Sequence, residues 1–153
     1  MAKRKKPASP KVPQVADPGV LSPAKRPATA VSVASILDMH PSWRLSLLDM
    51  DGPFGWVGLP GEELREIRGK LVEYEGLMWR EIKVEQADRN HLISIQSMSP
   101  EAQNRLRKIL PGVDELFSLR LTGKGRIFGI IQERGVMLVV WWDPGHRVCP
   151  VKK

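Results

Sequence analysis

The side chains best suited to chemistry lie in the last third of the sequence. Arg120, Lys124 and Arg126 come from one short segment, and His146 follows further along the chain. Guanidinium and ammonium groups bind phosphate oxygens, and an imidazole transfers protons near neutral pH. Metal-independent cleavage of RNA needs such groups, because a ribose 2′-hydroxyl attacks the adjacent phosphate and the developing negative charge must be stabilised. The residue types therefore indicate Arg120, Arg126 and His146 as candidate catalytic residues.

These side chains must be positioned by the apolar segments around them. Residues 116–121, 126–131 and 137–142 are apolar runs separated by two short connections that end in Gly125 and Gly135. This pattern predicts a three-stranded antiparallel meander. Because the third run is apolar throughout, we expect it to be a central strand or a strand covered on both faces.

The register of the meander decides which side chains share a face. If each connection has three residues and its final glycine is left-handed, Thr122 faces Arg126, and Arg126 faces Trp142. One face then carries Ser118, Arg120, Thr122, Arg126, Phe128 and Trp142. The other face is wholly apolar and carries Phe117, Leu119, Leu121, Ile127, Ile131, Met137, Val139 and Trp141. We expect helices to cover the apolar face and the basic face to stay open.

An open sheet face with two arginines and an indole is suited to single-stranded nucleic acid. Trp142 would stack on a base, while Lys124 and Arg147 would add contacts to phosphates. Two other interpretations stay open. In the first, the arginines are only solvated and Trp142 packs under a neighbouring loop. In the second, which concerns His146, the imidazole hydrogen-bonds to Asp143 and completes a turn.

Metal and covalent chemistry have little support in the sequence. Asp143, His146 and Cys149 recur every three residues, but the segment is interrupted by proline, so the zinc signal is weak. Cys149 has no orienting third group except Asp143 on the same segment, which argues against a nucleophilic role. The chain also lacks a phosphate-cradling glycine loop, a nucleophile elbow and a paired-carboxylate motif. We expect no metal and no cofactor.

The remaining elements predict an α+β fold. Apolar side chains at helical spacing predict a helix over residues 62–74, and Ser99 is a strong cap for a second helix over 100–110. Alternating apolar residues predict strands at 43–47 and 91–95. We expect an antiparallel sheet with the meander at its C-terminal end and helices packed on one face.

The chain length of 153 residues suits one domain with a tail. Residues 1–32 contain six of the 13 prolines and no aromatic residue, which predicts disorder. Residues 33–153 are expected to form the domain, with an extension at 33–90 and a core at 91–153. The single cysteine excludes an internal disulfide, and no apolar run is long enough to cross a bilayer, so we expect a cytoplasmic protein.

The net charge of +7 is concentrated at the two ends of the chain. Residues 1–32 hold seven basic residues and one acidic residue, and residues 118–153 hold seven basic and two acidic residues. The middle of the chain is acidic, with ten basic and fourteen acidic residues at 33–117. The basic tail either holds nucleic acid without reading its sequence or only keeps the protein in solution.

Residues 116–130 and 140–150 carry a resemblance to known proteins, through an arginine-glycine strand and a terminal His-Arg step. They are similar to a group of small uncharacterised bacterial proteins, over most of residues 41–151. More distantly, a helix that leads into a basic meander resembles the RelE/ParE superfamily of toxins from toxin-antitoxin pairs.

The resemblance implies a compact α+β domain whose open sheet face cleaves messenger RNA or, in the ParE branch, inhibits DNA gyrase. It implies that Arg120, Lys124 and Arg126 are phosphate-binding or transition-state cations, with His146 or Arg147 at the end of the last strand. In the family a tyrosine is often found near the C-terminus, whereas this chain has Val148, Cys149 and Pro150 there.

The leading hypothesis is a toxin-like, metal-independent endoribonuclease that acts on RNA, either free or on the ribosome. An acidic antitoxin protein would be its partner and would cover the basic face. One alternative is a non-catalytic nucleic-acid-binding module. Another is an inhibitor of the ParE type that binds a protein.

Overall fold

A five-stranded sheet forms the centre of the protein in the computed structural model, which describes residues 36–150. The strands are β1 (Ser42–Arg44), β2 (His91–Ser94), β3 (Glu115–Arg120), β4 (Arg126–Ile131) and β5 (Val136–Asp143). They lie in the order β1-β5-β4-β3-β2, and only β1 and β5 run parallel. The α+β fold and the C-terminal meander are confirmed, and the predictions for residues 1–32 lie outside the described residues.

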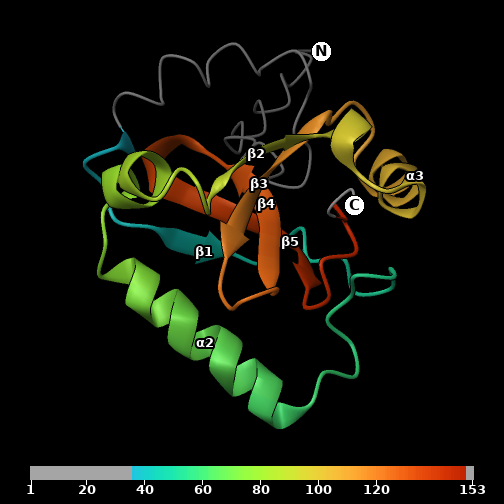
Figure 1. Ribbon diagram of the computed structural model, residues 1–153, viewed down its shortest axis with the longest axis horizontal. Helices are drawn as coiled ribbons and strands as arrows, with labels where there is room; N and C mark the ends of the chain where they lie inside the picture. Colours follow the sequence, from blue (N-terminus) through green and yellow to red (C-terminus); the bar gives the residue numbers. More distant parts are fainter. Residues whose placement is uncertain (1–35, 151–153) are drawn as a thin grey trace, which may run out of the picture.

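Two α-helices and three short helical turns complete the described chain (Figure 1). The α-helices are α2 (Gly61–Glu75) and α3 (Pro100–Ile109). The short turns are η2 (Glu81–Glu85), η3 (Ile95–Ser97) and η4 (Glu133–Gly135). Helix α3 begins as predicted, because the Ser99 hydroxyl accepts a hydrogen bond of 3.2 Å from the Ala102 backbone N–H.

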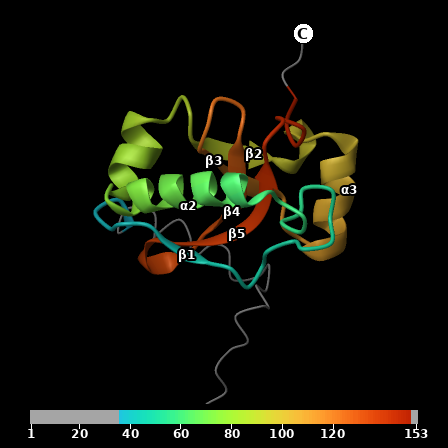
Figure 2. The same cartoon turned by 90° about the horizontal axis from the view of Figure 1, so that it is seen from below.

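Both faces of the sheet are covered. Helix α2 and η2 pack on one face, in a hydrophobic cluster that includes Ile67, Ile82 and Phe117. Helix α3 packs on the opposite face, where Ala102 and Leu106 join a second cluster. The expectation that helices cover one face only is therefore corrected, and Figure 2 shows α2 and α3 at separate sides of the sheet.

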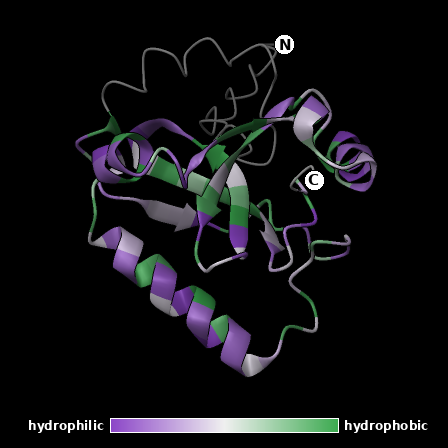
Figure 3. Ribbon diagram, viewed as in Figure 1, coloured by the Kyte–Doolittle hydropathy of each residue, from purple (hydrophilic) through white to green (hydrophobic). Residues whose placement is uncertain are grey.

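Helices cover both faces of the sheet because its central strands are apolar on both sides. Neighbouring residues such as Leu116 and Phe117 belong to the two different clusters, so both sides of β3 carry apolar side chains. Strand β5 is buried along almost its whole length and lies between β1 and β4, as its continuous apolar run predicted. The hydropathy colours of Figure 3 show these apolar central strands beside an α2 of alternating polarity.

A β-bulge in β5 changes which face its last residues occupy. Gly129 pairs with Val139 and Phe128 pairs with Trp141, so Val140 is an extra residue on β5. As a result Trp141 lies in the cluster with α3, while Trp142 lies in the cluster with α2. A count by strict alternation places both tryptophans on the wrong faces.

The β3–β4 connection also differs from the expected three residues. Arg120 pairs directly with Arg126, so residues 121–125 form the connection. The Leu121 N–H donates to the Gly125 carbonyl at 2.9 Å, and the backbone φ of Gly125 is not positive. The pairing is shifted by two residues from the prediction, and a shift of two leaves every side chain on its predicted face. In the β4–β5 connection, Gly135 does take the left-handed conformation, with φ of 74°.

Candidate functional site

Arg120, Arg126 and Asp143 form a row across the end of the sheet. Arg120 on β3 lies directly opposite Arg126 on β4, and Arg126 lies opposite Asp143 on β5. Cross-strand partners project from the same face, so the two guanidinium groups start from neighbouring positions on one side. The sequence predicted that Arg120 and Arg126 share a face, but it placed Thr122 and Trp142 opposite Arg126, where the structure has Arg120 and Asp143.

The sheet end that carries the two arginines, residues 120–126, is held by several hydrogen bonds. The Arg120 guanidinium donates to the Thr122 carbonyl at 3.1 Å and to the Gly123 carbonyl at 3.0 Å. The backbone of Arg120 is fixed as well, since its N–H donates to the Asn90 side chain at 2.9 Å and its carbonyl accepts from the Tyr74 hydroxyl. We call this sheet end the hairpin end.

The hairpin end carries three cations, and the neighbouring carboxylate of Asp143, opposite Arg126, does not form an ion pair with them. Arg120, Lys124 and Arg126 form no ion pair within the part of the chain that the structure describes. Burial and then the charge of Arg120 lower the pKa of Arg126, while Asp143 acts in the opposite direction. A half-buried cation beside a second cation is unfavourable, so an anionic ligand would stabilise this arrangement.

Asp143 closes the turn that follows β5. Its buried carboxylate accepts hydrogen bonds from the N–H groups of Arg147 and Val148, at 2.9 and 2.7 Å. The turn is therefore completed by Asp143, but through backbone donors and not through His146. His146 is half-buried and has a left-handed backbone with φ of 62°.

Arg147 has protein partners on the surface. Its guanidinium donates to the Glu101 carboxylate at 2.8 Å and lies 5.4 Å from the centre of the Phe54 ring. Both side chains of the ion pair are more than half exposed, so the pair is weak. The role of Arg147 in binding nucleic acid stays a prediction.

Trp142 does not lie on an open surface. The residue is 3% exposed, and its indole N–H donates to the Glu63 carboxylate of α2 at 2.6 Å. The bulge at Val140 turns it to the face opposite Arg126. The prediction that Trp142 stacks on a base is wrong, because its ring is covered by the protein.

The face that bears the two arginines is covered as well, apart from its end. Phe128, in the middle of β4, is 1% exposed and packs in the cluster that contains Leu106 and Val148. The prediction of an open basic sheet face is therefore wrong. At the hairpin end Lys124 is exposed, and Arg120 and Arg126 are half-buried, so this end is accessible for binding.

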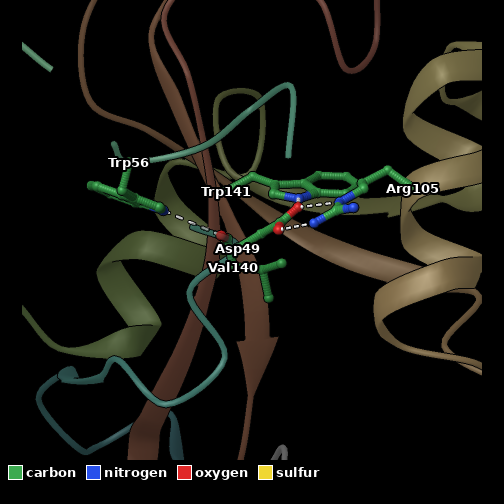
Figure 4. A network of polar contacts seen from close by, with 5 residues as sticks. All are labelled: Asp49, Trp56, Arg105, Val140 and Trp141. Atoms are coloured by element: carbon green, nitrogen blue, oxygen red, sulfur yellow. Dashed lines mark hydrogen bonds and ion pairs between the residues drawn. The ribbon is translucent and has the colours of Figure 1, made fainter. Parts of the chain in front are cut away.

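A second polar cluster was not predicted from the sequence (Figure 4). The buried Asp49 carboxylate accepts two hydrogen bonds from the Arg105 guanidinium, at 2.8 and 2.6 Å, and one from the Trp141 indole at 2.9 Å. Asp49 also joins β5 through its N–H, which donates to the Val140 carbonyl at 3.0 Å. Every group in this cluster is satisfied within the protein, which is typical of a structural anchor.

An open pocket of about 610 Å³ lies next to the hairpin end. Helix α2, the segment after η2 and the β3–β4 connection form its walls. Its lining residues are Glu66, Lys70, Glu73, Tyr74, Leu77, Gln86, Arg89, Arg120, Leu121, Thr122 and Gly123. This pocket could not be predicted from the sequence, because its walls come from three separate segments.

Comparison with known proteins gives no assignment. No family model matches the chain, and no curated protein or solved structure is significantly similar to it. Between residues 36 and 150, no group of three His, Cys, Asp or Glu side chains is arranged to hold a metal ion. In the same range no helix is long and apolar enough to span a bilayer. The resemblance to the RelE/ParE toxins stays a prediction, and the α+β fold is what is established.

Proposed function

We propose that the protein binds the phosphate backbone of single-stranded RNA at the hairpin end. The observation that carries this proposal is the direct cross-strand pairing of Arg120 with Arg126, without a paired anion in the described chain. Like charges placed opposite each other destabilise a sheet, and an anion bound between them would reduce this repulsion, which supports the proposal. RNA is the polymer that the resemblance to RelE/ParE toxins implies.

Lys124 extends the cationic surface beyond one phosphate. It is exposed at the tip of the connection between the two arginines, and its carbonyl accepts a hydrogen bond of 3.5 Å from Arg126. Three cations in a short connection suit successive phosphates of a flexible strand. Without an accessible aromatic ring beside them, this contact would hold the backbone and would not select a sequence.

The salt dependence of RNA binding tests this proposal. Each phosphate contact on a single strand contributes about 0.7 to the slope of log K against log salt concentration. We expect Arg126→Gln and Lys124→Gln each to lower the slope by about 0.7. Binding is measured by fluorescence anisotropy with a short oligouridine at several salt concentrations.

A matched control separates the hairpin end from general charge. Lys108→Gln removes one exposed cation from the last turn of α3, away from the hairpin end, and should leave the slope unchanged. An equal loss in Lys108→Gln and Arg126→Gln would show that binding follows net charge and would contradict the proposal. No binding by the parent protein would also overturn it.

RNA cleavage at the same place is the second candidate. The left-handed backbone of His146 favours it, because strained non-glycine residues are concentrated at functional sites. In this reaction the 2′-oxygen attacks the adjacent phosphorus and the bond to the 5′-oxygen breaks, which leaves a 2′,3′-cyclic phosphate and a 5′-hydroxyl. His146 takes the proton of the 2′-hydroxyl, water protonates the leaving 5′-oxygen, and Arg120 and Arg126 stabilise the added negative charge. Incubation of labelled RNA with the protein in a chelator decides between the two. RNA that is retained intact supports binding alone, while shortening that is lost in His146→Ala supports cleavage.

A further inference from the structure

The pocket beside the hairpin end contains groups that are not used by the protein itself. Within it, Lys70 pairs with Glu73 at 3.4 Å. Arg89 and Glu66 also line the pocket, and neither forms an ion pair in the described part of the chain. One free cation and one free carboxylate therefore face the same space.

The cationic side of the pocket adjoins the proposed phosphate site. The Arg120 guanidinium donates to the carbonyls of Thr122 and Gly123, and all three residues line the pocket. The Tyr74 hydroxyl donates to the Arg120 carbonyl. Burial raises the pKa of this hydroxyl, while a hydrogen bond with Asn90 and the charges of Arg89 and Arg120 act in the opposite direction. Arg89 and Arg120 thus both line the pocket next to the hairpin end, where an RNA strand that leaves the hairpin end would meet them.

Other residues that line the pocket are suited to a base. Glu66 and Gln86 provide hydrogen-bonding groups, and Leu77 provides an apolar contact. The volume of about 610 Å³ lies within the usual range for small-molecule pockets and is sufficient for one nucleotide. Single-stranded RNA is read in this way, by bases that are turned out of the strand and bound through their Watson-Crick edges.

We propose that this pocket binds one guanine nucleotide of the RNA, with its phosphate at Arg89 and Arg120 and its base at Glu66. The inference depends on the proposed function, which supplies the RNA strand at the hairpin end. Guanine is the base that fits a free carboxylate best, because its N1–H and N2–H donors lie side by side and bond to both carboxylate oxygens. Adenine and cytosine offer one exocyclic amine beside a ring acceptor, which a carboxylate would repel.

The test compares three oligonucleotides in binding to the full-length protein. They are an oligouridine, the same strand with one central guanosine, and the same strand with inosine in its place. Inosine lacks the N2 amine and keeps N1–H. We expect the guanosine strand to bind about tenfold more tightly than oligouridine, and inosine to lose most of that gain.

Two substitutions in α2 test whether Glu66 is the residue that gives the preference for guanosine. Glu66→Gln should remove the preference for guanosine and leave the affinity for oligouridine unchanged, because the backbone contacts are made elsewhere. Glu62→Gln, an exposed residue of the same helix that does not line the pocket, should keep the preference. Equal affinity of the parent protein for guanosine and uridine strands, or a preference that survives Glu66→Gln, would overturn the inference while the proposed function stands.

A further experiment applies if the protein does not bind RNA and the proposed function is wrong. If no oligonucleotide binds, 5′-GMP and 5′-IMP are titrated into the protein and into Glu66→Gln by calorimetry. Tighter binding of 5′-GMP that is lost in Glu66→Gln would retain the pocket as a guanine nucleotide site without RNA. Absence of binding by both nucleotides would overturn the pocket as well.

Discussion

Asp49 is a buried charged residue held by several hydrogen bonds. Its side chain is 3% exposed, and the N–H groups of Arg105 and Trp141 saturate its carboxylate. A side chain at Gly52 would also not fit, since its Cβ would lie 2.1 Å from an Asp49 carboxylate oxygen. These contacts join the segment after β1 to α3 and β5. Removing one partner of such a buried pair leaves the other charge without compensation.

We therefore predict that Asp49→Ala lowers the free energy of unfolding by about 3 kcal/mol at neutral pH. Hydrogen bonds from Arg105 lower the pKa of Asp49 below its ordinary value of 3.8, so the stabilisation is complete above that value and is lost as the pH falls through the lower folded pKa. Urea unfolding of both proteins from about pH 6 to about pH 2 measures this. The difference between them should shrink at the acid end.

The exposed ion pair between Arg147 and Glu101 provides the control. Glu101→Ala should change stability by less than about 1 kcal/mol at neutral pH. A difference between the parent and Asp49→Ala that is constant across the pH range would contradict the assignment to ionisation of Asp49.

At the scale of single elements, the bulge in β5 depends on Gly129. A Cβ at Gly129 would lie 2.2 Å from the Leu138 carbonyl oxygen, so the two strands approach too closely there for any other residue. We predict that Gly129→Ala lowers the free energy of unfolding by about 2 kcal/mol, because the strands must separate or the bulge must move. Urea unfolding provides the measurement.

Gly123, in the β3–β4 connection, provides the control for Gly129→Ala. No atom lies within 4 Å of a Cβ built at Gly123, so Gly123→Ala should change stability by less than about 0.5 kcal/mol. Equal unfolding free energies for the two variants would show that the close approach at Gly129 has no energetic cost.

Most of the sheet could be predicted from the sequence, but the bulge in β5 could not. The helices and the meander follow from local signals, such as the cap at Ser99 and the continuous apolar run of β5. The shared face of Arg120 and Arg126 also follows, because a register error of two residues does not change the faces. Trp142 was misplaced since one extra residue reverses alternation beyond it. An isolated glycine in a strand, as at Gly129, was the available signal.

Other parts of the site could not be found in this way. The pocket joins α2, the segment around Arg89 and the β3–β4 connection, and no local pattern specifies how distant segments meet. The contact between Asp49 and Arg105 spans 56 positions in the sequence, so spacing gave no reason to pair them. The cover of the basic face by α3 likewise results from tertiary packing.

At the scale of the whole molecule, both faces of the sheet are covered, so the proposed binding would take place at an edge of the fold. Clusters on both sides of the sheet fill the faces that a flat nucleic-acid platform would need. The folded part therefore offers a small cationic surface at the hairpin end. A small surface makes few phosphate contacts, and its affinity depends strongly on any additional cations that the chain supplies.

Residues 1–32, outside the described part of the chain, are the obvious source of such cations, with seven basic residues and one acidic residue. We predict that deleting them flattens the salt dependence of RNA binding, while Arg126→Gln still lowers the slope by about 0.7 in the shortened chain. The two effects should add, because separate sets of phosphates are contacted. Anisotropy titrations of the four proteins, parent, deletion, substitution and both together, measure the coupling. If the effect of Arg126→Gln disappears after the deletion, the hairpin end does not hold RNA by itself, whereas an unchanged slope after the deletion would leave residues 1–32 as a spacer.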